Sequence, residues 1–61
     1  MPQVNQEELQ ILRHLIGSHE MAYQKLQTYA QQATDPQIKA FFQKSSQDAQ
    51  HTKQQLTTFL S

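Results

Sequence analysis

The chain has 61 residues, enough for one domain with a small hydrophobic core. It contains no Cys, which excludes disulfides, thiolate metal sites and a cysteine nucleophile. Five basic and five acidic residues cancel, and no window gathers the Lys and Arg that would follow a phosphate backbone. We therefore expect no nucleic-acid partner, and we expect so small a chain to gain stability from self-association.

No apolar run is long enough to span a bilayer, and the first residues lack the basic and apolar regions of a secretion signal. These features predict a cytoplasmic protein without membrane insertion. Thirteen Gln residues take the place of surface charges, and Gln is a good helix former. Gln-rich chains can also be disordered, but here the hydrophobic periodicity favours helices.

The first predicted helix covers about residues 6 to 33. Asn5 can cap its free amides, and Glu8 stands at the third helical position, which completes a capping box. Gly17 interrupts the helix on its outer side, at a cost of about 1 kcal/mol relative to Ala. Apolar or bulky residues recur at alternating spacings of three and four and form a contact stripe: Leu9, Leu12, Ile16, His19, Tyr23, Leu26, Ala30 and Ala33.

The second predicted helix covers about residues 36 to 60. Thr34 ends the first helix, Asp35 can cap the second, and Pro36 occupies the first helical position, where its missing amide hydrogen has no consequence. The connection is therefore very short. The contact stripe of this helix has the same alternating spacing: Ile38, Phe42, Ser45, Ala49, Thr52, Leu56 and Phe59.

Two long helices joined by so short a connection predict an all-α fold, an antiparallel helical hairpin that forms a single domain over residues 1–61. Residues whose numbers sum to about 70 would lie at the same level along such a hairpin. Small residues in the middle of the second helix would face large ones on the first, which suits close packing.

Four residues lie beside the contact stripes and would be only partly covered by one hairpin: Leu15, Ala22, Tyr29 and Phe41. We predict that they form a self-association interface, with Phe41 as the first choice for a contact between copies. Two hairpins related by a two-fold axis would form a homodimeric four-helix bundle of the ferritin-like kind.

One polar level near the middle of both helices contains the candidate metal ligands His19, Glu20, Asp48 and His51. Asp48 and His51 have the spacing of the Glu-x-x-His pairs in di-metal bundles. On a helical wheel, however, they do not both face inward, which favours an exposed pair on one helix. The sequence therefore predicts no cofactor, with a divalent metal as the alternative.

His19 is the candidate ligand that faces the core. It would be a metal ligand, a titrating switch, or a buried neutral imidazole hydrogen-bonded to Thr52, Ser45 or its symmetry mate. No catalytic residue is predicted, because the pair Ser45-Ser46 faces a helix contact without a base or a pocket.

The segment from Leu12 to Leu60 resembles the spore coat protein F-like family. The resemblance is carried by Ser18-His19-Glu20-Met21-Ala22-Tyr23, by Asp35-Pro36-Gln37-Ile38-Lys39 with Phe42 after it, and by the Gln-rich stretch through Asp48 and His51. It implies a ferritin-like bundle that serves as a structural component of the spore. Family members are commonly longer, so this chain looks like a minimal half, and it lacks the inward Glu-x-x-His pair of metal-binding relatives.

The sequence thus predicts a non-enzymatic structural protein that binds itself and other coat proteins, in the cytoplasm or the spore coat. Two alternatives stay open. A metal-binding ferritin-like bundle would melt at a higher temperature with Zn²⁺, Mn²⁺ or Fe²⁺. An adaptor would accept a partner's amphipathic helix and would be a monomer at micromolar concentration.

Overall fold

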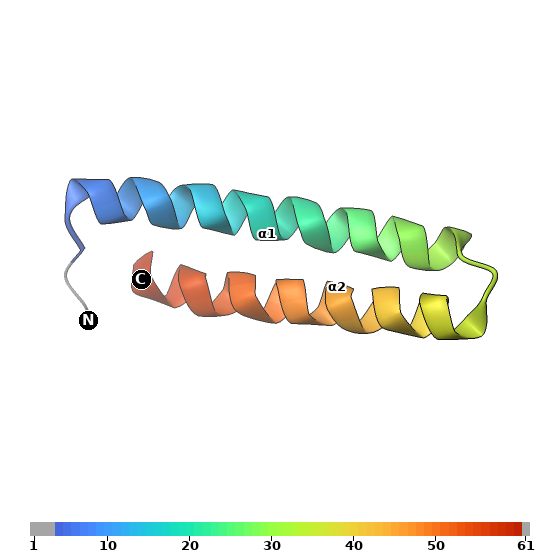
Figure 1. Cartoon of the computed structure of the whole chain (residues 1–61). Coiled ribbons are helices and arrows are strands. Elements are labelled where there is room, and N and C mark those ends of the chain that lie inside the picture. Colours follow the sequence, from blue (N-terminus) through green and yellow to red (C-terminus); the bar gives the residue numbers. More distant parts are fainter. Residues whose placement is uncertain (1–3, 61) are drawn as a thin grey trace.

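A computed structural model of the chain describes residues 4–60 and shows two long helices that pack side by side in opposite directions (Figure 1). Helix α1 spans Gln6–Gln32 and helix α2 spans Pro36–Thr57. A short 3₁₀ helix, η1, follows over Thr58–Leu60. The molecule measures 45 × 16 × 12 Å, and the predicted all-α hairpin is confirmed.

Both helices begin at the capping residues that the sequence indicates. The side chain of Asn5 accepts a hydrogen bond from the amide of Glu8 at 2.8 Å, and the Glu8 carboxylate accepts one from the Asn5 amide at 3.0 Å. The Asp35 carboxylate accepts bonds of 2.9 and 3.0 Å from the first free amides of α2. These bonds satisfy amides that would otherwise lack partners, so they fix where each helix starts.

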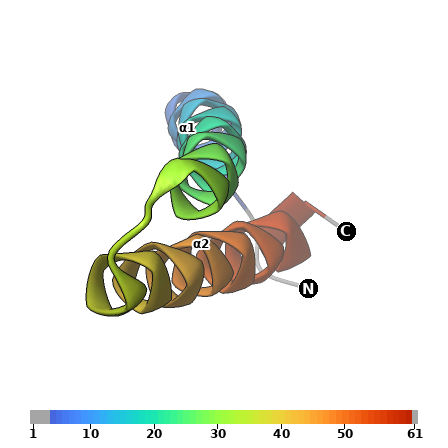
Figure 2. The same ribbon diagram turned by 90° about the vertical axis from the view of Figure 1, so that its right-hand side faces the viewer.

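The register of the hairpin follows from three contacts between the helices. In each contact the two residue numbers sum to between 69 and 73, which confirms the predicted value of about 70. The contacts are an ion pair, a hydrogen bond and a ring contact: Glu20 with Lys53, Tyr23 with Ser46, and Tyr29 with Phe42. Figure 2 looks along the hairpin from the loop end and shows α1 lying across α2, with no further layer formed by residues 4–60.

The buried core is very small. Within residues 4–60 the buried side chains are Ala30, which is 4% exposed, and Ser46, which is 3% exposed. The Ser46 hydroxyl donates to the backbone carbonyl of Tyr23 at 3.4 Å, so α2 lies close to the backbone of α1 at this point. Small residues permit that approach, but they remove little apolar surface from water.

The contact stripe of α1 agrees with the prediction, since all eight of its residues are buried or half-buried. On α2 the middle of the stripe agrees and its two ends do not. Ile38 is 50% exposed because it lies level with the end of α1, where little of that helix is left to cover it.

Phe59 is 44% exposed, and the prediction that α2 continues to about residue 60 is wrong. The α-helix ends at Thr57, and η1, with three residues per turn, follows it over Thr58–Leu60. The contact also includes Ser46 and the half-buried Lys53, each one residue beyond the predicted positions Ser45 and Thr52.

Candidate self-association surface

Large apolar side chains remain exposed along one side of the helix contact. On α1, Leu15 is 36% exposed and Tyr29 is 47% exposed, with the half-buried Ala22 midway between them. Their spacing of seven residues keeps them on one side of the helix. On α2, Phe41 is 67% exposed. These exposures agree with the partial coverage expected from the sequence.

We use the name apolar face for this side of the hairpin, which comprises Leu15, Ala22 and Tyr29 of α1 with Ile38, Phe41 and Phe42 of α2.

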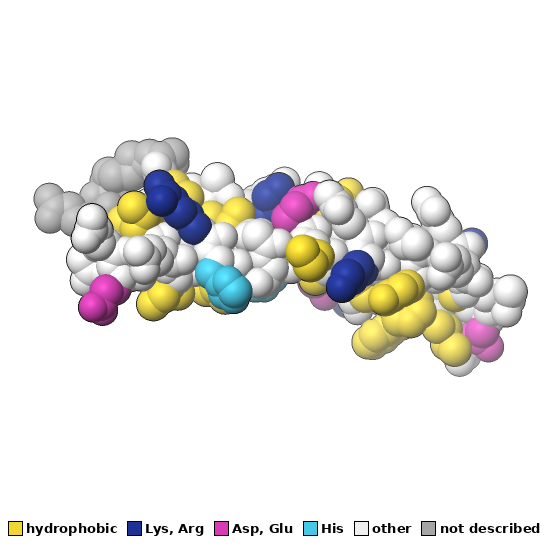
Figure 3. All heavy atoms as spheres, turned by 90° about the horizontal axis from the view of Figure 1, so that it is seen from above, with side chains coloured by type: hydrophobic (Ala, Val, Ile, Leu, Met, Phe, Trp, Pro, Cys, Tyr) yellow, Lys and Arg dark blue, Asp and Glu magenta, His cyan; other side chains and the backbone are white. Residues whose placement is uncertain are grey.

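Three aromatic rings lie together near the loop end of the apolar face. The half-buried ring of Phe42 lies 5.9 Å from the ring of Tyr29 and 6.2 Å from the ring of Phe41, at tilted and edge-on angles that aromatic pairs prefer. Ile38 lines a shallow groove beside Tyr29 and Phe42. Figure 3 shows hydrophobic side chains gathered over this end of the molecule. Phe42 is thus tied to the hairpin, while Phe41 projects from it.

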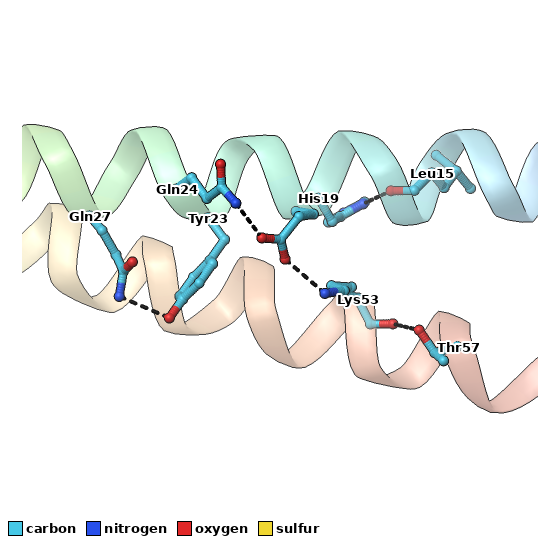
Figure 4. A network of polar contacts seen from close by, with 8 residues as sticks. Leu15, His19, Tyr23, Gln24, Gln27, Lys53 and Thr57 are labelled. Atoms are coloured by element: carbon cyan, nitrogen blue, oxygen red, sulfur yellow. Dashed lines mark hydrogen bonds and ion pairs between the residues drawn. The ribbon is translucent and has the colours of Figure 1, made fainter.

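The opposite side of the helix contact is polar. It forms a groove bordered by Lys39, by the Tyr23 ring and by five glutamines. The glutamines are Gln27, Gln31, Gln43, Gln47 and Gln50. By helical-wheel position these residues face away from the apolar face. The Gln27 amide donates to the Tyr23 hydroxyl at 2.9 Å (Figure 4). The hairpin therefore has one side suited to water and one suited to a protein contact.

An ion pair joins the two helices on the polar side. Lys53 Nζ lies 2.8 Å from Glu20 Oε1, and Gln24 donates to the other carboxylate oxygen at 2.6 Å (Figure 4). The hydrogen bond from Lys53, and after it the one from Gln24, lower the pKa of Glu20 below its usual value of 4.5. Lys53 was not among the residues predicted from the sequence, although the hairpin register places it near the level of Glu20, which carries the opposite charge.

The structure does not gather the four candidate metal ligands. Within residues 4–60, no three His, Asp or Glu side chains lie close enough to hold a metal ion. Glu20 is engaged by Lys53, and the exposed Asp48 lies 3.9 Å from Lys44 within α2. His51 is exposed. One hairpin therefore supplies at most isolated ligands at this level.

His19 is half-buried, and its hydrogen-bond partner differs from the predicted ones. Its Nδ1 lies 2.8 Å from the backbone oxygen of Leu15, one turn earlier in α1 (Figure 4). A carbonyl oxygen accepts, so Nδ1 carries the hydrogen in this bond. Of the three alternatives for His19, the buried imidazole bonded to Thr52 or Ser45 is not found within one hairpin, because the ring finds an acceptor in its own helix.

Comparisons of the chain with protein-family models, with curated proteins and with solved structures found no match. Over residues 4–60, neither helix combines the length and the apolar character needed to cross a membrane. The function is therefore inferred from the surfaces of the hairpin.

Proposed function

We propose that this chain is a non-enzymatic structural protein that acts by self-association, with two hairpins pairing through the apolar face into a four-helix bundle. The observation that carries the proposal is the exposure of Leu15, Tyr29 and Phe41 on one side of a hairpin that buries just Ala30 and Ser46 among residues 4–60. Large exposed apolar side chains gathered on one side of a minimal core mark a candidate protein contact.

The amount of exposed surface leaves room for a partner. The chain exposes 4886 Å², whereas a well-packed monomer of 7.1 kDa exposes about 4,100 Å². The hairpin is thin and elongated, 45 × 16 × 12 Å, so large apolar side chains stay in contact with water until a partner covers them. A second copy offers a matching surface with the same composition, and two-fold pairing is the commonest symmetry of small homo-oligomers.

The setting that we propose is the cytoplasm of an endospore-forming cell or its spore coat, where other coat proteins would be further partners. The support is the resemblance of residues 18–23 and 35–39 to the spore coat protein F-like family. A fluorescent fusion that collects at the surface of the developing spore would agree with this setting. An even distribution through the cell during sporulation would contradict the coat assignment and leave self-association untouched.

Sedimentation velocity of the chain and two variants tests self-association. Phe41→Gln removes the most exposed ring of the apolar face, and Met21→Gln is the matched control, because Met21 is 59% exposed on the outer side of α1. We expect Phe41→Gln to raise the dimer Kd at least about tenfold, since each copy loses the burial of one ring, and Met21→Gln to leave it unchanged. Equal effects of the two variants would contradict the proposed surface. A parent chain that stays monomeric at micromolar concentration would contradict self-association and favour the adaptor function.

A further inference from the structure

We infer that two copies of this chain pair head to head, with both loops at the same end of the bundle, around a two-fold axis parallel to the helices. This inference rests on the proposed self-association and adds its geometry. In such a pair, α1 of each copy covers α2 of the other. Residues that lie at the same distance from the loop end then meet across the interface. Tyr29 then meets Phe41 of the second copy, and Lys25 meets Asp48 of the second copy.

The alternative two-fold axis is perpendicular to the helices and gives a head-to-tail pair. It places α1 on α1 and α2 on α2, with the levels reversed along the molecule. Ala22 would lie at the axis, because it lies midway between Leu15 and Tyr29 along the apolar face. The two arrangements bury the same side of the hairpin, so total area does not distinguish them. The distribution of aromatic and charged residues does.

The aromatic residues favour the head-to-head pair. Tyr29 and Phe42 lie at one level, with ring centroids 5.9 Å apart, and Phe41 projects beside them with 67% of its surface exposed. In the head-to-head pair the aromatic cluster of one chain contacts the same cluster of the second chain, so that aromatic surface covers aromatic surface. The head-to-tail pair would instead place Phe41 against the polar stretch of α2 around Gln55.

The charges favour the same arrangement. The numbers of Lys25 and Asp48 have the same sum as those of Glu20 and Lys53, which form an ion pair, so Lys25 and Asp48 share a level. On a helical wheel both lie at the rim of the apolar face. The head-to-head axis therefore creates two ion pairs between copies. The head-to-tail axis brings the two Asp48 carboxylates toward each other, and like charges across an interface oppose association.

The present surroundings of Asp48 leave room for such a partner. Its carboxylate is 3.9 Å from Lys44 Nζ, and the two side chains are 69% and 79% exposed, so this contact within α2 is loose. Lys25 is exposed as well. A second copy can therefore supply Lys25 to Asp48 without displacing a buried interaction.

Distances between spin labels distinguish the two arrangements. The chain has no Cys, so a single engineered Cys takes one label. Gln31→Cys labels the loop end and Gln10→Cys the open end, and by helical wheel both lie on the side away from the apolar face. The two positions are about 30 Å apart along α1.

In a head-to-head dimer each label lies at the same level as the identical label on the second copy, so both singly labelled proteins give the shorter distances, which are set by the width of the bundle alone. Mixing the two labelled proteins then gives the longer distance. A head-to-tail dimer produces the reverse pattern, with long distances in each single sample and a short one in the mixture, and that pattern would overturn the inference.

Charge reversal tests the ion pair directly. We expect Lys25→Asp or Asp48→Lys alone to raise the dimer Kd about tenfold, because each turns two attractions into two repulsions, and the double variant to restore it. Lys39→Asp is the matched control on the polar side and should have no effect. Additive losses in the double variant would contradict the pairing. A parent chain that is monomeric would overturn the proposed function itself, whereas a head-to-tail dimer would overturn the geometry alone.

Discussion

Lys53 Nζ lies 2.8 Å from Glu20 Oε1 and connects the two helices near the middle of the hairpin. The two side chains are about one-third exposed, 35% for Lys53 and 34% for Glu20. A pair at this position does little to bury apolar surface. It favours one alignment of α1 against α2, because a helix shifted by one repeat of the contact stripe would separate the two charges. It also places a titrating carboxylate on the contact between the helices.

Glu20 makes the stability of the hairpin depend on acid pH. Because the folded protein lowers the pKa of Glu20 below its usual 4.5, the carboxylate contributes stability above that value. The contribution is lost as the pH falls below 4.5 and through the lower pKa of the folded state. We expect Glu20→Gln to melt at a lower temperature than the parent at pH 7 and to lose less stability between pH 5 and pH 3. Melting curves at fixed protein concentration measure both effects.

Lys53→Gln is the matched variant, because it removes the partner of Glu20 and leaves the carboxylate in place. It should also melt at a lower temperature than the parent at pH 7 and lose less stability between pH 5 and pH 3. A Glu20→Gln variant with the same acid slope as the parent would show that the ion pair with Lys53 does not stabilise the fold.

Gly17 is a weak point that can be removed. A Cβ placed on this residue meets nothing within 4 Å, and the backbone at Gly17 is helical. We therefore expect Gly17→Ala to raise the free energy of unfolding by about 0.5 to 1 kcal/mol per chain, through the lower entropy of the unfolded state. Urea denaturation at fixed concentration measures the change. Gln10→Ala serves as control, since Gln and Ala differ little in helix propensity. A destabilised Gly17→Ala would indicate a contact on the outer side of α1.

Ser46 limits how closely the helices approach. Its side chain is 3% exposed, and its hydrogen bond to the Tyr23 carbonyl is long at 3.4 Å. We expect Ser46→Leu to lower the free energy of unfolding by about 1 to 3 kcal/mol, because the added volume forces α1 and α2 apart. Ser46→Ala should change it by less than about 1 kcal/mol, since a bond of this length contributes little. Equal stability of the Leu and Ala variants would mean that the helices are not in close contact there.

Divalent metal should not change the melting temperature. Glu20 is engaged by Lys53, and His19 donates Nδ1–H to Leu15, so neither is presented toward Asp48 or His51. A ligand that binds the folded state raises its stability, and we expect Zn²⁺, Mn²⁺ and Fe²⁺ to leave the midpoint unchanged. A rise with Zn²⁺ that is lost in His19→Ala would restore the metal-binding function as a candidate.

The start of each helix could be predicted from sequence because capping is local. Asn5 and Glu8 are three residues apart, and the Asp35 carboxylate reaches the amides two and three positions ahead, so a few adjacent residues contain the information. The stripe of α1 was predictable for the same reason, since its period is regular over the whole helix.

The details of the helix contact could not be predicted in this way. A stripe gives the centre of the contact on each helix, but it does not show that Ser46 and Lys53 join the contact or that Ile38 lies where α1 ends. The hydrogen-bond acceptor of His19 depends on the rotamer of its side chain. One rotamer reaches the Leu15 carbonyl in the same helix, and another would reach residues of α2. Exposure of Phe41 and Tyr29 was predictable, because both lie off the stripes.

Self-association requires that a second copy of the chain covers the apolar face. Sedimentation equilibrium of the unmodified protein over a range of micromolar concentrations tests it most directly. We predict a mass that approaches about 14 kDa, twice the 7.1 kDa of one chain. A mass that stays at 7.1 kDa throughout that range would contradict self-association.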